Sequence, residues 1–475
     1  MSQDQLLLGE ERRPRRSLTP ALTGSVFVAC MGALQFGYHM AELNAPQEVL
    51  MCHGPLDPAY ADTWWGRHGW DQCLHLNDSQ YGLVTSIFSV GGLVGSLCTG
   101  SQADRYGRRP AAIGSSVLAA MGSAAMVFAN SYAQLLVGRL IVGVGCGGGI
   151  VVTSLMLNEM APTELKGALG ALNQTCINLG ILVTQLLAFA WANSVQWRLL
   201  FLAATLVAAV HCALLLGVDE SPRWLAANGD EQGAERVLRR LRAGDGAETA
   251  HELREWRRGR EHEAAGQCSS LRRYMQDARY ARVRGVVAVL LMGQQFCGIN
   301  SIVFYGVKLI SGALPELSIA VNFGISVVNL IVTLTAAGLV DRLGRRPLLQ
   351  FSAAAMAVAS TLMAAGILLN SAAVLVVCTF AYIMFFALGF GPIPFLIIAE
   401  LSSPGTAAVA QSYGIALNWV ATFIVGFGFP ILNKLIGGYV FAMFGAFAAF
   451  MALYVRHRVP ETRGKHDYRE VWQGF

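Results

Sequence analysis

The chain has 475 residues, of which 54% are hydrophobic and only 14% are charged. A soluble protein of this length usually carries nearly twice that share of charged residues, so the composition argues against a soluble fold. The net charge of +5 is modest, and the basic residues between positions 223 and 284 alternate with glutamates. No nucleic-acid partner is therefore expected.

Twelve apolar segments follow one another along the chain, and each could cross a lipid bilayer as a helix, which takes roughly 20 residues. The first is too long for the apolar core of a secretory signal. The sequence therefore predicts an all-α membrane protein with twelve transmembrane helices. The segments cover residues 22–42, 82–102, 111–129, 132–155, 168–191, 198–217, 285–311, 318–340, 348–369, 373–399, 411–433 and 436–455.

A charged segment at residues 218–284 separates these spans into two groups of six. The second span of each group ends in a similar turn, which reads DRYGRR from Asp104 and DRLGRR from Asp341. Parallel repeats of this kind are a known transporter design. We predict two pseudo-symmetric halves, at residues 22–217 and 285–455, joined by a helical linker.

Basic residues also predict the orientation of the chain. Four arginines precede the first span, and the linker is rich in arginine. By the positive-inside rule, we expect the tails at residues 1–21 and 456–475 to lie with the linker on the cytoplasmic side. The sequence has no obvious organelle address, so the plasma membrane and a vacuolar membrane both stay open.

Charges of both signs gather near the predicted cytoplasmic ends of the spans. We expect them to form a latch that holds one state of the protein and breaks in another, and solvated helix ends are the alternative interpretation. Since an exposed ion pair contributes only about 0–1 kcal/mol, the latch must act as a network. The candidate latch residues are Asp104, Arg105, Arg108, Arg139, Glu159, Lys166, Glu220, Arg223, Asp341, Arg345, Glu400 and Glu461.

Uncharged amide side chains lie within the apolar spans. An amide offers both hydrogen-bond donors and an acceptor, which suits a neutral solute rich in hydroxyl groups. A single buried amide more often joins two helices, but several in a few spans favour a binding site for such a solute. The candidates are Gln174, Gln294, Gln295, Asn300, Asn329 and Asn418.

The tenth span contains Gly391, Pro392 and Pro394. Glycine and proline interrupt the helical hydrogen-bond ladder, which a membrane tolerates only where other groups satisfy the backbone. We expect a bending point for gating at these residues, and a static kink is the alternative.

The loop after the first span carries Cys52 and Cys73, whose disulfide is plausible on the non-cytoplasmic side. It also carries Asn77, which begins an Asn-Asp-Ser glycosylation acceptor. The sequence contains no Walker loop and no catalytic or metal-binding constellation. We therefore expect neither an enzyme nor a cofactor or metal.

Several short motifs occur along the chain, which are QFGY from Gln35, NAPQ from Asn44, ESPR from Glu220, QQFCGIN from Gln294, NW from Asn418 and PETR from Pro460. Together they resemble the sugar porter family of the major facilitator superfamily, in particular the facilitative glucose transporters and their fungal relatives. The resemblance implies the major facilitator fold and alternating access of a central sugar site to the two sides of the membrane. We also expect the protein to act as a monomer.

The resemblance also implies roles for individual residues. The amides named above would line the sugar site, with Phe386 and Trp419 as its aromatic lining and Tyr305 as a gating aromatic. Proton-coupled relatives carry Asp at the position of His39. We therefore expect a facilitative uniporter for a hexose-like monosaccharide, with a proton-coupled sugar or polyol transporter that uses His39 as the alternative. A sugar sensor that does not transport is less well supported.

Overall fold

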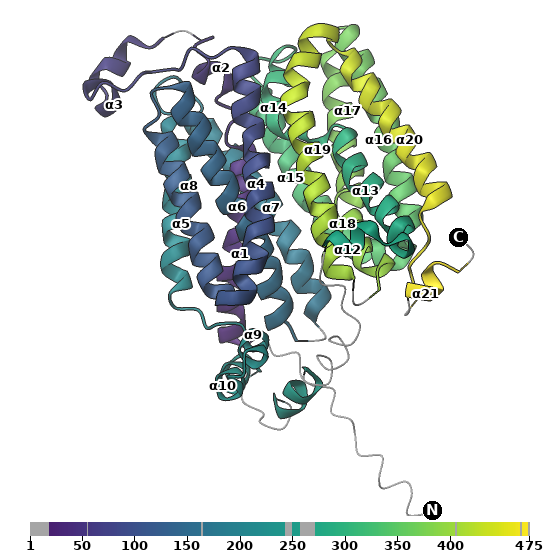
Figure 1. Ribbon diagram of the computed structural model, residues 1–475. Coiled ribbons are helices and arrows are strands. Elements are labelled where there is room, and N and C mark those ends of the chain that lie inside the picture. The colour runs from purple at the N-terminus through teal and green to yellow at the C-terminus, as the bar shows by residue number, and fades with distance from the viewer. Residues whose placement is uncertain are drawn as a thin grey trace, which may run out of the picture.

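The computed structural model describes residues 19–54, 56–162, 165–242, 249–256, 271–403, 406–465 and 468–473. All regular secondary structure in these residues is helical, and twelve of the helical segments are long and apolar enough to cross a membrane. The predicted all-α membrane fold is confirmed. Figure 1 shows two bundles side by side, one from each half of the sequence.

The N-terminal bundle contains six spanning helices, which are α1 (Pro20–Ala41), α4 (Asp78–Tyr106), α5 (Arg108–Val127), α6 (Tyr132–Met160), α7 (Lys166–Trp191) and α8 (Arg198–Leu215). The C-terminal bundle begins with α13 (Ala281–Phe296) and α14 (Ile299–Ser311), which form one span. It continues with α15 (Ser318–Leu343) and α16 (Arg345–Leu368). A further span comprises α17 (Ala372–Phe385), a π-helical turn at Phe386–Phe390 and α18 (Ile393–Leu401), and is followed by α19 (Ala407–Ile436) and α20 (Tyr439–Arg458).

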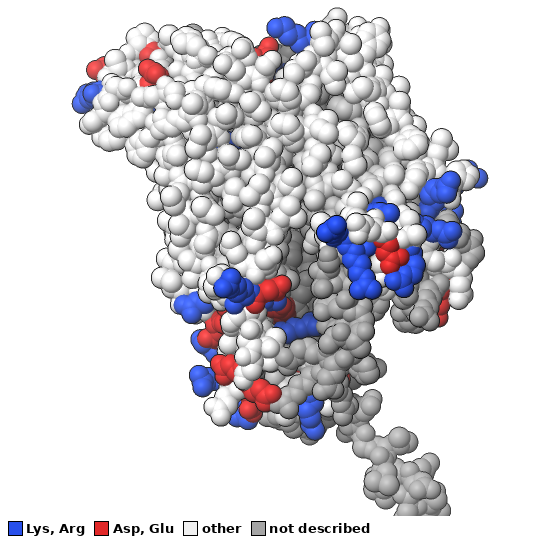
Figure 2. All heavy atoms as spheres, in the orientation of Figure 1, with Lys and Arg blue, Asp and Glu red and all other residues white. Residues whose placement is uncertain are grey.

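Short helices mark the two ends of the molecule. We call the end that carries α9 (Pro222–Ala227) and α10 (Glu231–Arg242) the linker end. The opposite end, called the disulfide end, carries α2 (Gln47–Leu50), α3 (Trp64–Arg67) and the disulfide between Cys52 and Cys73. The helices α12 (Leu271–Gln276) and α21 (Tyr468–Val471) lie at the linker end of the C-terminal bundle. In the view of Figure 2, most charged side chains gather at the linker end, and the middle of the bundle is nearly free of them.

Close helix packing explains much of the glycine content. A Cβ added to Gly91 or Gly95 of α4 would lie 2.3 or 2.1 Å from a backbone carbonyl oxygen of α6, and one added to Gly147 of α6 would lie 2.3 Å from a carbonyl oxygen of α4. Only glycine allows these two backbones to approach so closely. Small residues serve this purpose in membrane helices, since dispersion contacts rather than hydrophobic burial hold such helices together.

Two spans of the C-terminal bundle are interrupted, and side chains satisfy the backbone at one of the breaks. Gly298 separates α13 from α14 and has the left-handed φ of +96°. At the other break, Ser352 Oγ donates to the carbonyl oxygen of Phe385 (2.7 Å) and accepts from the N–H of Phe390 (3.0 Å). Irregular backbone inside a membrane requires such partners.

Candidate functional site

Four amide side chains of the C-terminal bundle form one hydrogen-bonded chain. Gln294 Nε2 donates to two carbonyl oxygens at the break between α17 and α18, at 2.7 and 2.9 Å. Gln294 Oε1 accepts from Asn418 (2.9 Å) and Gln295 (3.2 Å). Asn300 Nδ2 donates to Oε1 of Gln295 at 2.5 Å. The structure thus brings together four of the six amides that the sequence singled out.

A second amide cluster joins the two bundles. Asn178 of α7 donates to Thr333 Oγ1 of α15 at 2.8 Å. Its Oδ1 accepts from Gln174 at 3.3 Å and from Asn329 at 3.4 Å. The sequence reasoning included Gln174 and Asn329 but missed Asn178 and Thr333. Asn178 lies four residues after Gln174, so both share one helix face, and this spacing would have identified it.

Trp419 of α19 fills the interface between the bundles. Its buried indole lies 5.7 Å from the ring of Phe36 and 6.1 Å from the ring of Phe88, both in the N-terminal bundle. A Cβ added to Gly92 of α4 would lie 2.5 Å from the indole. Phe386, the other predicted aromatic of the sugar site, is half-buried at the start of the π-helical turn.

Polar contacts hold the two bundles together at the disulfide end. Lys308 of α14 lies 3.2 Å from the carboxylate of Asp78 and 3.4 Å from that of Glu48. Asn44, which follows α1, accepts a hydrogen bond from the N–H of Val307 at 2.9 Å. Each of these contacts crosses from the N-terminal to the C-terminal bundle, so polar groups join the two bundles at this end.

Tyr305 lies where three helices of the two bundles meet. Its hydroxyl donates to the carbonyl oxygen of Gly426 at 2.8 Å, and its ring stacks on Phe429 with centroids 5.4 Å apart. A Cβ added to Gly426 would lie 3.1 Å from Phe304 of α14 and 3.4 Å from Ser86 of α4. The gating role of Tyr305 stays a prediction, and its position at the crossing is compatible with that role.

The residues of the predicted bending point surround the break before α18. The N–H of Gly391 donates to the carbonyl oxygen of Phe386 at 2.8 Å, which closes the π-helical turn. Pro392 precedes α18, and the buried Pro394 occupies its first turn. The helical ladder is thus interrupted at these residues, as a bending point requires.

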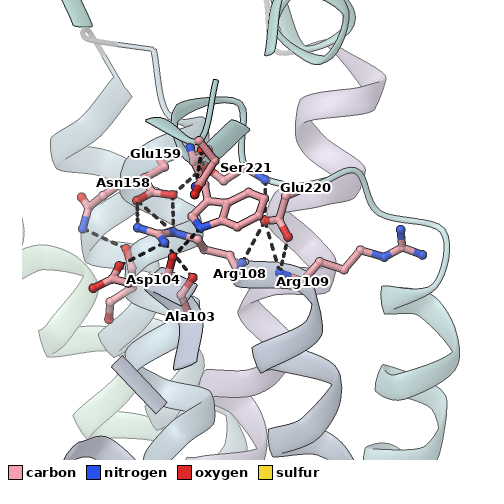
Figure 3. Close-up of polar contacts among 11 residues, drawn as sticks. Ala103, Asp104, Arg108, Arg109, Asn158, Glu159, Glu220 and Ser221 are labelled. Carbon is pink, nitrogen blue, oxygen red and sulfur yellow. Dashed lines mark hydrogen bonds and ion pairs between the residues drawn. The ribbon is translucent and has the colours of Figure 1, made fainter. Parts of the chain in front are cut away.

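The charged turn of the N-terminal bundle forms a compact network at the linker end (Figure 3). The Arg108 guanidinium donates to Glu159 at 2.7 Å, and Ser221 Oγ donates to the same carboxylate at 2.5 Å. Glu220 accepts from the backbone N–H groups of Arg108 (2.9 Å) and Arg109 (3.1 Å). A carboxylate is stabilised at this position because the first N–H groups of a helix have no partner within the helix.

The C-terminal bundle repeats this network. Arg345 donates to Glu400 at 2.9 Å, and Thr462 Oγ1 donates to the same carboxylate at 2.5 Å. Glu461 accepts from the backbone N–H groups of Arg345 and Arg346, both at 3.0 Å. The contacts described here join residues of a single bundle, so each network ties the helix ends of its own half together.

The other candidate latch residues are placed differently. Asp104 contacts Arg108 at 3.1 Å, Arg105 lies over the ring of Tyr106, and Arg223 is exposed on α9. The side chains of Lys166 and Asp341 lie outside the described residues.

Comparison with known proteins identifies the family. A family model described as sugar (and other) transporter matches residues 25–470. The chain belongs to this family. A probable metabolite transport protein of Saccharomyces cerevisiae is 49% identical to the transporter over 98% of each chain. The human facilitated glucose transporter member 4 is 33% identical over 95% of this chain and 90% of its own.

Solved structures show the same fold. The xylose transporter XylE of E. coli, in a partially occluded inward-open conformation, superposes on the transporter with a TM-score of 0.77 at 22% identity. The match covers 93% of this chain and all of XylE. The predicted major facilitator fold is therefore confirmed. Membership of the sugar (and other) transporter family and the twelve apolar helices identify an integral multi-pass membrane transporter rather than an enzyme.

Arg139 does not belong to the linker-end charges of the transporter, and its predicted place in the latch was wrong. It lies in the second turn of α6, near the disulfide end, and is fully buried. Its guanidinium donates to Glu42 at 2.5 Å and to the carbonyl oxygen of His39 at 2.7 Å. The imidazole Nδ1 of His39 lies 2.9 Å from the same Glu42 oxygen. The burial is possible because the charges of Arg139 and Glu42 compensate each other.

Asn77 lies exposed at the start of α4, where its Oδ1 accepts from the N–H of Gln80 at 2.8 Å as a helix cap. Its glycosylation stays a prediction. Within the described part of the transporter, no group of three or more His, Cys, Asp or Glu side chains could hold a metal ion.

Proposed function

We propose that this transporter carries a hexose-like monosaccharide by alternating access. The observation that carries the proposal is the pair of uncharged amide clusters, of which one spans the bundles through Asn178 and Thr333. Sugar hydroxyls can replace the mutual hydrogen bonds of these amides at little net cost, because hydrogen bonds are exchanged rather than lost. A charged solute would find no opposite charge among these side chains, which favours a neutral solute.

The arrangement of the bundles supports a direction of opening. The contacts of Lys308 and Asn44 join the two bundles at the disulfide end, whereas the charged networks of the linker end each lie within one bundle. The positive-inside rule assigns the linker end to the cytoplasm. We therefore propose that the structure is closed to the non-cytoplasmic side, and that rocking of the two bundles exposes the site alternately.

Counterflow of labelled hexose in proteoliposomes tests the proposed function. Gln294→Ala removes the amide that donates through Nε2 and accepts through Oε1. Since each lost hydrogen bond costs about 1–2 kcal/mol, we expect the KM for hexose to rise about 5- to 30-fold. Gln276→Ala, at an exposed position of α12, is the matched control and should leave KM unchanged. Wild-type vesicles that exchange a polyol but no hexose would contradict the hexose assignment.

Proton-coupled transport is a second candidate function, favoured by the buried cluster of His39, Glu42 and Arg139. Ionisable side chains inside a membrane often mark a proton pathway, and histidine changes charge near neutral pH. Ser123 of α5 faces His39 at 3.5 Å, and the guanidinium of Arg139 lies 4.6 Å from the ring centroid of Phe88 of α4. The cluster thus places an imidazole 2.9 Å from a carboxylate inside the N-terminal bundle.

An imposed pH gradient separates uniport from coupling. A uniporter takes up hexose only down the hexose concentration gradient. A proton-coupled carrier accumulates hexose against that gradient until a protonophore abolishes the pH difference. If transport is coupled, we expect His39→Asn to abolish accumulation and to retain counterflow. If wild-type uptake is independent of the pH gradient, the coupled function is excluded and uniport is the remaining mechanism.

A further inference from the structure

The loop between α1 and α4 carries a cluster of aromatic rings that transport does not explain. The short helix α3 contains the neighbours Trp64 and Trp65 and is followed by Gly69, whose φ of +77° turns the chain back. Trp70 therefore stacks on Trp64, with ring centroids 5.2 Å apart and an angle of 16°. His68 lies 4.4 Å from the Trp64 ring. Despite these contacts, Trp64 is 54% exposed.

The loop is fixed firmly to the N-terminal bundle. The disulfide between Cys52 and Cys73 closes it. The buried Arg198 of α8 donates to the carbonyl oxygens of Asp71 (2.8 Å) and Val127 (2.8 Å) and lies 5.8 Å from the ring of Trp65. These contacts connect the loop to the ends of α5 and α8. The aromatic cluster therefore has a defined position relative to the spans.

The cluster continues the lipid-facing surface of α5. Phe128, which directly follows this span, is 44% exposed and lies 6.1 Å from Trp65 and 5.5 Å from Trp70. Met121 is 59% exposed on the same face of α5. Figure 1 shows α3 at the outer edge of the N-terminal bundle, away from the C-terminal bundle. The tryptophans thus lie at the depth where the span ends.

We propose that Trp64, Trp65 and Trp70 anchor the N-terminal bundle in the phospholipid headgroup layer at the disulfide end. Tryptophan is enriched at this depth of membrane proteins because its ring is apolar and its N–H is polar. The exposed Arg67 of the same helix adds a cation that suits the lipid phosphate. The partner is the surface of the bilayer itself, and the anchor acts whatever solute the protein carries.

Fluorescence quenching by brominated lipids tests the anchor. The full-length protein is reconstituted in phosphatidylcholine brominated either close to the headgroup or deep in the acyl chains. Trp64→Phe and Trp70→Phe keep the packing of the rings and remove one indole each. The difference between wild-type and variant emission is the fluorescence of the removed indole. We expect bromine close to the headgroup to quench this fluorescence, and iodide in the aqueous phase to leave it unquenched. Trp224→Phe at the linker end is the matched control for the loss of one indole.

Two outcomes would overturn the anchor. If the emission lost in the Trp64 and Trp70 variants is quenched by iodide and not by lipid bromine, the rings face water. If free hexose instead protects these rings from iodide, the cluster is a carbohydrate platform. Thermal unfolding of each variant, compared with wild type, verifies that the loop is still folded.

Discussion

Asn178 is the residue whose contacts connect the two bundles most directly at the amide clusters. Its side chain has partners in Gln174, Asn329 and Thr333. We expect Asn178→Ala to weaken hexose affinity about 5- to 30-fold, because the partner groups lose hydrogen bonds of about 1–2 kcal/mol. Binding measured by calorimetry on purified protein checks this.

Asn158→Ala provides the control for Asn178. Asn158 is exposed on α6 and donates to a carbonyl oxygen of its own helix, so its removal should not change hexose affinity. Equal affinities of the two variants would show that Asn178 is a helix–helix contact without influence on the sugar.

At the scale of residues, the sequence identified which side chains are functional candidates better than it identified the residues that they contact. Gln294 and Asn418 stand out because an amide in an apolar span is rare, and the structure brings them together. Arg139 was misplaced because a charge near the end of a span is usually solvated. Its partner Glu42 lies 97 positions away in the sequence, and only the fold shows that the two charges compensate each other.

The two charged turns give a prediction at the scale of helices. Gly107 and Gly344 precede α5 and α16 with φ/ψ of +106°/162° and +94°/161°, a backbone conformation that is essentially restricted to glycine and costs a residue with a Cβ about 1–3 kcal/mol. The added Cβ would also lie 2.3 Å from a Glu220 oxygen, or 2.9 Å from a Glu461 oxygen. We expect Gly107→Ala to lower the melting temperature more than Gly344→Ala.

The control for both glycines is Gly114 within α5. A Cβ at Gly114 meets no atom within 4 Å, so Gly114→Ala should raise helix stability by about 0.5–1 kcal/mol. Thermal unfolding in detergent measures all three variants. Equal melting temperatures for Gly107→Ala and Gly114→Ala would contradict the role of the turn.

The helices themselves could largely be predicted, because spans need long apolar segments. The exact ends could not: α4 continues to Tyr106 and α6 to Met160, beyond the apolar segments expected to end at residues 102 and 155. Charged side chains at a helix end reach towards water or pair with one another, so a change in hydropathy does not end the helix. The break at Gly298 was also missed, since no proline accompanies it.

At the scale of the whole molecule, the repeated turn predicted two related halves, and the networks of Glu159 and Glu400 have the same geometry in each. The sequence did not show that each network lies within one half, because an arginine of one bundle could equally pair with a glutamate of the other bundle. Nor did it indicate the contacts of Lys308, which bring together residues from distant spans.

Lys308 leads to the prediction for the molecule as a whole. It bridges the bundles at the disulfide end through Asp78 and Glu48, and these contacts must break when that end opens. Since the Lys308 side chain is 36% exposed, solvent screening limits each pair to about 0–1 kcal/mol. Loss of about 1 kcal/mol of ion-pair energy changes an equilibrium about fivefold. We therefore expect Lys308→Met to raise the ratio of molecules open to molecules closed at the disulfide end by up to about fivefold for each ion pair removed.

Distances between spin labels on unnatural amino acids at Ser79 and Leu317 measure this shift, because one site lies on each bundle at the disulfide end. Wild-type protein in about 1 M salt should move in the same direction as Lys308→Met, since the screening length falls to about 3 Å. Lys434→Met, which removes an exposed charge at the end of α19, should leave the distances as they are. A distance distribution that responds to neither Lys308→Met nor salt would show that apolar packing, rather than this ion pair, keeps the disulfide end closed.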